Sequence, residues 1–290
     1  MKPTIQFLAI AVSIAFSGAA HAQSKTWTLN DTNSAAPSTA VCSQTATGDG
    51  KAIGNAYGCQ QQPTGTTNTL VVTGWSGSSS ANFAKAAVTP QNGNGYGVGN
   101  ATEGGKSADG STGDHSVDNG GKGGTDALLL KFTTGAEALT HVTVGWSGTD
   151  GDFSILRWVG VEAPTEAQLM TNLKTNTLTG AGKGWELVSI VNGNGYIDNP
   201  DTRFTGFNNG LLTSSYWLLS AYDVGYGTSV SGTSSGTATS GIDQLKFVGI
   251  GTTQSGGSGS GNVPEPGSLA LAGLAIAGLV GAKRRRAQTV

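Results

Sequence analysis

Charged residues are scarce in this 290-residue chain: Asp, Glu, Lys and Arg make up 12% of it, about half the usual share. Five of the 16 basic residues, Lys2 and the run 283–286, lie near the two ends, together with one acidic residue, Glu265. The region between the ends therefore holds 11 basic and 17 acidic residues, a formal charge of −6. Because such a surface repels phosphate backbones, we expect no nucleic-acid partner.

Residues that carry common catalytic chemistry are also few. Only two of the three histidines, His115 and His141, lie outside the first 22 residues, and His141 falls in a predicted strand. The chain has no H-E-x-x-H zinc motif and no phosphate-binding loop. We therefore expect a protein that is not an enzyme. Glycoside hydrolysis, which needs only two carboxylates across a cleft, remains the weakest alternative.

The N-terminal end has the layout of a secretory signal peptide over residues 1–22. Lys2 is followed by an apolar run over 5–16 and then by Ala20-His21-Ala22. Small residues two apart after an apolar core are typical of a cleavage site. We expect export through the Sec machinery and a mature chain that starts near Gln23. A buried N-terminal helix, the alternative, would leave the Ala-x-Ala pattern unexplained.

The C-terminal end combines four features in a fixed order. A Gly/Ser linker over 254–262 precedes Val263-Pro264-Glu265-Pro266, which is followed by an apolar segment over 267–282. A basic end over 283–290 opens with four cations, Lys283, Arg284, Arg285 and Arg286. A helix of 16 residues is about 24 Å long, and Lys and Arg side chains can extend its reach toward the ~30 Å of a bilayer core. The cations predict a cytoplasmic end, which leaves 23–262 on the exported side.

This tail resembles the PEP-CTERM sorting signal of Gram-negative bacteria. The resemblance implies a precursor held transiently in the inner membrane and processed by an exosortase. It also implies delivery to the cell surface or extracellular matrix of a bacterium that makes extracellular polysaccharide. An ordinary single-pass anchor is the alternative, although such an anchor has no need of Pro-Glu-Pro.

The region between the ends has the pattern of an all-β domain. Short apolar runs rich in Val, Leu, Trp and Tyr alternate with Gly, Asn, Ser and Thr clusters, as in strands separated by turns. The clearest predicted strands are residues 69–75, 127–132, 142–146, 153–159, 185–191, 216–222 and 245–250. We expect a single β-sandwich or jelly-roll-like domain over 23–253 with long Gly-rich loops, including 93–124, and one short helix over 165–173.

Two sets of residues in this domain suggest specific chemistry. Cys42 and Cys59 would lie on the oxidising side of the membrane, so we expect a disulfide between them. Aspartate and asparagine oxygens beside glycines are ligands of the kind that Ca²⁺ needs. The Ca²⁺ candidates are Asp118, Asn119, Asp126, Asp150 and Asp152. Their alternative role is to form turns, which Asp, Asn and Gly also favour.

Aromatic residues offer a further possibility, because sugar rings stack on aromatic faces. The six tryptophans are Trp27, Trp75, Trp146, Trp158, Trp185 and Trp217. Together with Tyr96 and Tyr196 they could form a polysaccharide-binding face, but a Trp in a strand more often belongs to the core. The sequence thus favours an exported surface or matrix protein with a structural or adhesive role in exopolysaccharide or biofilm. A carbohydrate-binding module with defined specificity is the alternative.

Overall fold

The computed structural model describes thirteen segments of the chain and the single residue 226. The segments are 24–29, 42–45, 53–61, 67–77, 83–91, 93–100, 115–120, 124–148, 150–160, 162–165, 184–193, 202–223 and 241–253. All of them belong to one compact unit, Met1–Ser255. The predicted signal peptide, the Gly/Ser linker and the sorting tail lie outside the described residues.

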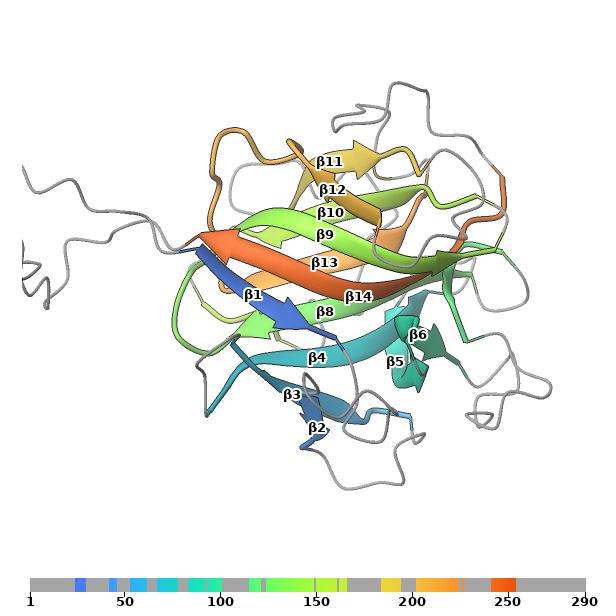
Figure 1. Cartoon of the computed structure of the whole chain (residues 1–290), viewed down its shortest axis with the longest axis horizontal. Helices are drawn as coiled ribbons and strands as arrows, with labels where there is room; N and C mark the ends of the chain where they lie inside the picture. Colours follow the sequence, from blue (N-terminus) through green and yellow to red (C-terminus); the bar gives the residue numbers. More distant parts are fainter. Residues whose placement is uncertain are drawn as a thin grey trace, which may run out of the picture. The chain divides into compact units, whose positions relative to one another are not determined.

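The described part of the chain contains 14 β-strands (Figure 1). The first seven are β1 (Ser24–Thr28), β2 (Cys42–Gln44), β3 (Ala56–Gln60), β4 (Asn68–Gly77), β5 (Phe83–Gln91), β6 (Gly95–Gly99) and β7 (Val117–Asp118). The rest are β8 (Thr125–Phe132), β9 (Ala138–Ser147), β10 (Phe153–Trp158), β11 (Trp185–Val191), β12 (Thr202–Thr205), β13 (Tyr216–Ala221) and β14 (Gln244–Thr253). All seven predicted strands are therefore confirmed.

Strand β5 joins two facing sheets into one. Its first half pairs with β4 in the order β11-β10-β13-β8-β4, and its second half pairs with β6 in the order β6-β14-β9-β12. The outer strands of the order, β11 and β12, share no ladder in the described part of the chain. Phe153 of β10 packs edge to face on Phe204 of β12 near this opening, with ring centroids 5.4 Å apart. The fold is thus all-β as predicted, but it is a nearly closed sheet rather than two separate layers.

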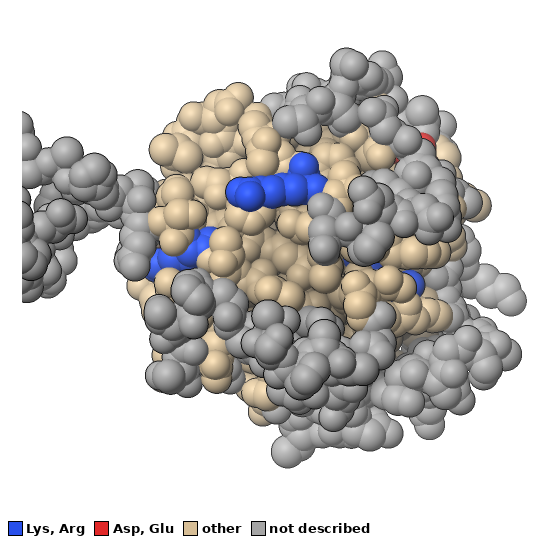
Figure 2. Space-filling view, in the orientation of Figure 1, with Lys and Arg blue, Asp and Glu red and all other residues tan. Residues whose placement is uncertain are grey.

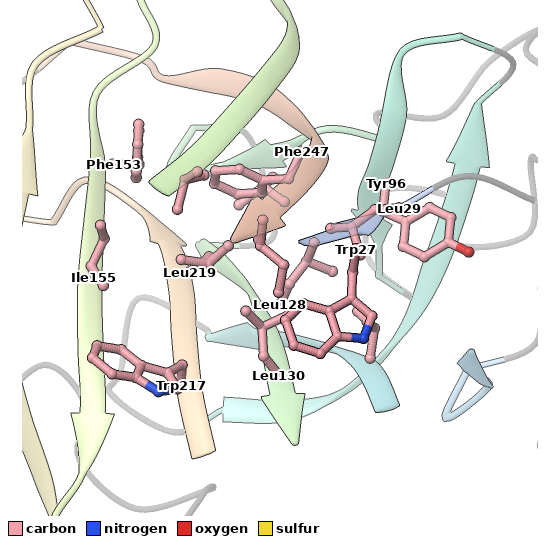
Figure 3. Close-up of a cluster of buried hydrophobic side chains, with 14 of the residues drawn as sticks. Trp27, Leu29, Tyr96, Leu128, Leu130, Phe153, Ile155, Trp217, Leu219 and Phe247 are labelled. Atoms are coloured by element: carbon pink, nitrogen blue, oxygen red, sulfur yellow. The ribbon is translucent and has the colours of Figure 1, made fainter. Parts of the chain in front are cut away.

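The main core fills the space between the two sheets. Figure 3 shows side chains from both sheets pointing toward one another there, including Trp27, Leu128 and Phe247. Each of these three side chains is at most 1% exposed. Alternation along the strands places the remaining apolar residues of β4, β8 and β13 on the opposite face, where a second cluster forms. The sheet that contains β8 is therefore apolar on both faces.

The face that carries β1, β14 and β9 has few charges. Figure 2 shows that most of its described surface is uncharged and that its Lys and Arg side chains lie apart from one another. Threonines such as Thr26 in β1 and Thr143 in β9 point outward there. This face reflects the low charge content of the sequence.

The predicted Gly-rich loop over 93–124 is wrong in part. Residues 95–99 form the fully buried strand β6, which pairs with β5 and with Phe247 of β14, and residues 117–118 form β7. A Cβ atom at Gly95 would collide with the carbonyl of Phe247, and one at Gly97 with the carbonyl of His115. The glycines are therefore needed for close backbone approach in a strand. Residues 101–114 lie outside the described residues.

The predicted disulfide is confirmed. Cys42 and Cys59 face each other in the β2–β3 ladder and are bonded. Both side chains are fully buried in the main core. The two cysteines are 17 positions apart in the sequence. Closing a loop of about this length stabilises a fold by about 3 kcal/mol in the chain-entropy account.

The predicted helix over 165–173 lies outside the described residues except for Thr165, which is in neither helix nor strand. Among the residues that the structure describes, no helix has the length and apolar character needed to cross a membrane. The predicted membrane segment over 267–282 is not among them.

Candidate metal centre

Three carboxylates meet at one end of the domain. Asp150 and Asp152 lie in the connection between β9 and β10, and Asp243 immediately precedes β14. One carboxylate oxygen from each lies within 4.8 Å of the others. Asp152 and Asp243 are at most 1% exposed, so two of the three carboxyl groups are buried side by side.

Backbone contacts hold the three residues together. Asp150 and Asp243 form an isolated parallel bridge, in which the N–H of Gln244 donates to the carbonyl of Asp150 at 3.1 Å. The N–H of Asp152 donates to Oδ1 of Asp243 at 3.1 Å. The N–H of Gly193 donates to Oδ1 of Asp152 at 2.8 Å. The cluster therefore sits on ordered backbone and does not depend on surface side chains.

Asn119 supports Asp243 from the segment after β7. Its Nδ2 donates to Oδ2 of Asp243 and, at 2.7 Å, to the carbonyl of Tyr222, while its Oδ1 accepts the N–H of Asp243 at 2.8 Å. Both polar atoms of the amide are thus used within the protein. Asn119 orients the carboxylate of Asp243.

The crowding of negative charge changes the acidity of this site. Burial, followed by the charges of Asp152 and Asp150, raises the pKa of Asp243 from 3.8 to about 8. Burial and then the charge of Asp152 also raise the pKa of Tyr222. A bound proton or a bound cation would each relieve the repulsion between the carboxylates.

The donor set consists of hard oxygen ligands. Ca²⁺ takes six to eight oxygens at about 2.3–2.6 Å and accepts irregular geometry, whereas softer metals prefer His and Cys. Three carboxylates would supply the charge, and water would complete the coordination. The chemistry of the cluster therefore fits Ca²⁺.

The structure brings together only some of the predicted ligands. Asp150 and Asp152 lie in the cluster, and Asn119 contacts it through Asp243. Asp118 is buried in β7, where its Oδ1 accepts the N–H of Gly120. Asp126 is buried in β8. Neither belongs to the group of three found among the described residues.

Asp243 was missed by sequence reasoning. It follows Ile242 and precedes the strand 245–250, so the sequence shows an ordinary charged residue before a strand. Its partners lie about 90 residues earlier in the chain. Only the β14–β9 pairing brings these positions together.

The aromatic face expected for sugar binding is not formed by most of the tryptophans. Five are buried: Trp27, Trp75, Trp158, Trp185 and Trp217. Tyr96 is fully buried as well, and Tyr196 lies outside the described residues. Trp146 is partly exposed, with the Lys246 ammonium 4.0 Å from its ring centroid. These five tryptophans therefore have the core role that is more common for a Trp in a strand, because the two apolar clusters bury them.

Protonation of His141 is expected to lower the stability of the folded domain in acid. It is 7% exposed in β9, and Nη2 of Arg203 donates to its Nδ1 at 2.9 Å, so the ring is neutral. Burial and then the charge of Arg203 lower its pKa from 6.5 to about 4. Protonation therefore favours the unfolded chain, and stability is lost as the pH falls from 6.5 toward 4. We therefore expect the Tm of the wild type, relative to that of His141→Gln, to fall between pH 7 and pH 4.5. Equal changes of Tm with pH in both proteins, measured by circular dichroism, would contradict this role.

Comparison with known families identifies the C-terminal end. Residues 262–286 match the PEP-CTERM protein-sorting motif. No curated protein and no solved structure matches the chain. The matched segment contains the predicted motif Val263 to Pro266 and the basic cluster Lys283 to Arg286. The motif implies processing by an exosortase and export to the cell surface of a Gram-negative bacterium. The chain is a PEP-CTERM sorting domain-containing protein.

Proposed function

We propose that the β-domain has a non-catalytic, structural or adhesive role in the extracellular polysaccharide matrix. The observation that carries the proposal is the sorting motif at 262–286, in a chain whose structurally described part is a disulfide-linked β-domain. Disulfides persist in oxidising compartments, which supports a place of work outside the cytoplasm. The Sec machinery, the inner membrane and the exosortase act on the precursor in this proposal.

Substitution of the sorting motif tests the proposal. We expect Pro264→Ala with Glu265→Ala to leave the tail uncleaved, because the exosortase would no longer recognise it. Intact mass would then include the tail, and the protein would stay in the membrane fraction. The wild-type protein should start near Gln23, end near Pro266 and fractionate with the matrix.

A matched control lies just outside the motif. Gln288→Ala changes the basic end beyond residue 286 and should leave processing unchanged. Deletion of the exosortase should reproduce the effect of the double variant. If the double variant is processed and reaches the matrix like the wild type, the motif does not direct sorting and the matrix role loses its support.

We also propose that Ca²⁺ binds Asp150, Asp152 and Asp243. The support is the hard-oxygen donor set, the 4.8 Å limit on its oxygens and the burial of two of the carboxylates. The ion would join the β9–β10 connection to the start of β14. Its role in this proposal is to stabilise the domain outside the cell, where Ca²⁺ is available.

A further inference from the structure

A pocket of about 760 Å³ opens where β8 and β10 end and β13 begins. Its lining comes from three segments of the chain: 131–136, 157–163 and 213–216. Strand pairing fixes the three segments relative to one another, because β13 pairs with both β8 and β10. The pocket is therefore built on rigid strand ends.

One side of the pocket combines an aromatic ring with a cation. Tyr216 of β13 and Lys131 of β8 are direct partners in the ladder, and the ammonium of Lys131 lies 5.9 Å from the centroid of the Tyr216 ring. Tyr216 is partly buried, and Lys131 is exposed. A ring in this position can stack on a sugar, while the ammonium beside it can pair with an anionic substituent.

Arg157 supplies a second cation to the lining. The guanidinium of Arg157 donates twice to Oε2 of Glu186, at 3.0 and 2.7 Å, and once to the carbonyl of Thr213 at 3.3 Å. A guanidinium has five N–H donors, so two remain for a ligand. Glu186 fixes the plane of the group, and a fixed fork of donors suits a carboxylate.

The other polar groups suit a sugar as well. Thr133 and Ser215 supply hydroxyl groups to the lining. Among the charged residues of the lining, Lys131 and Arg157 are positive and Glu162 is negative, and Arg157 is also paired with Glu186. The pocket thus combines an aromatic ring, hydroxyl groups, the ammonium of Lys131 and the remaining N–H donors of Arg157.

We propose that this pocket binds a carboxylated sugar unit of an extracellular polysaccharide, an inference that rests on the proposed matrix role. Tyr216 stacks on the sugar ring, and Lys131 and Arg157 bind the carboxylate. Hydroxyl groups of the sugar bond to Thr133 and Ser215. This places the recognition of the matrix at the strand ends, where Trp158 is the tryptophan that lines the pocket.

Binding of two defined polysaccharides tests the proposal. Polygalacturonate is the acidic probe and dextran the neutral one, with the mature exported protein measured by affinity electrophoresis. We expect the wild type to be retarded by polygalacturonate and not by dextran. Lys131→Gln should bind polygalacturonate at least fivefold more weakly, and Tyr216→Leu, which keeps an apolar side chain, at least tenfold.

The control is Lys85→Gln, which removes an exposed lysine of β5 outside the pocket and should bind like the wild type. Unchanged Tm values would show that the pocket variants fold. Equal binding by wild type and both variants would overturn the pocket as the site. Absence of wild-type binding to polygalacturonate, or equal retardation by dextran, would overturn the acidic specificity. Binding to the polysaccharide of the producing strain, measured in parallel, tests the matrix role separately.

Discussion

Glu137→Gln should destabilise the domain by about 3–5 kcal/mol, because it leaves a buried ammonium without its carboxylate. Lys25 of β1 donates to Oε1 of Glu137 at 2.6 Å, and the two side chains are 7% and 0% exposed. Oε2 of Glu137 also accepts the hydroxyl of Thr252 in β14 at 3.0 Å. The residue therefore ties β1 and β14 to the start of β9.

The position of β1 increases the expected effect. In the described part of the chain, β1 shares a ladder only with β14, along the register from Ser24↔Thr253 to Thr28↔Gly249. Trp27 of the same strand lies in the main core. Loss of the ion pair should loosen β1 and expose Trp27. Urea unfolding followed by tryptophan fluorescence measures both effects.

A double variant tests whether the destabilisation by Glu137→Gln comes from the unpaired ammonium of Lys25. Lys25→Met with Glu137→Gln removes the buried ammonium, so it should be more stable than Glu137→Gln alone. Glu186→Gln is the matched control, because the Arg157–Glu186 pair is 18% and 40% exposed and should contribute less than about 1 kcal/mol. A double variant as unstable as the sum of the single variants would show that the pair is not coupled.

Ca²⁺ should raise the Tm of the EDTA-treated domain by about 5–10 °C when its concentration is about a hundredfold above the dissociation constant. Ligand binding at that ratio stabilises a fold by about 2.7 kcal/mol, and about 2–4 °C per kcal/mol is typical of a domain of this size. Mg²⁺ should have a smaller effect, because it demands stricter octahedral geometry. Calorimetry of the domain in EDTA, with Ca²⁺ and with Mg²⁺ measures the three Tm values directly.

The pH dependence of this shift follows from Asp243. Its pKa is raised from 3.8 to about 8 in the folded metal-free protein, so the folded state binds the proton more tightly than the unfolded chain does. This contribution to stability is complete below pH 4 and is lost as the pH rises toward 8. In EDTA the Tm should therefore fall between pH 5 and pH 8.5, and the gain from Ca²⁺ should be larger at pH 8 than at pH 5.

Asp243→Asn tests the same site without the charge. We expect this variant to lose the response to Ca²⁺ and the fall in Tm with rising pH in EDTA. Asp223→Asn is the control, because Asp223 bonds to Thr125 and lies outside the three-carboxylate group. A Ca²⁺ response that survives in Asp243→Asn, or that is absent from the wild type, would contradict the metal proposal.

Local patterns in the sequence predicted much of the fold. The seven predicted strands have dense apolar runs, and all seven form. Other strands were missed because their composition is atypical: β5 contains Lys85 and Pro90, and β6 alternates glycine with Tyr96 and Val98. Such residues form strands here because neighbouring backbone and burial decide their conformation.

The candidate sites depended on tertiary structure to a greater extent. Asp150 and Asp152 were predicted together because they are two residues apart, whereas Asp243 joins them only through the pairing of β14 with β9. Tyr216 and Lys131 lie 85 positions apart, and the β13–β8 register makes them neighbours. No local pattern encodes such a register.

The sequence alone therefore determined the C-terminal sorting motif, the all-β class and the Cys42–Cys59 pair, because each depends on residues near one another in the chain or on the choice between only two cysteines. The tertiary structure decided which tryptophans are buried, which carboxylates meet and where a pocket opens. The physical reason is that these features arise from strands far apart in sequence, whose registers are set by the packing of the whole core.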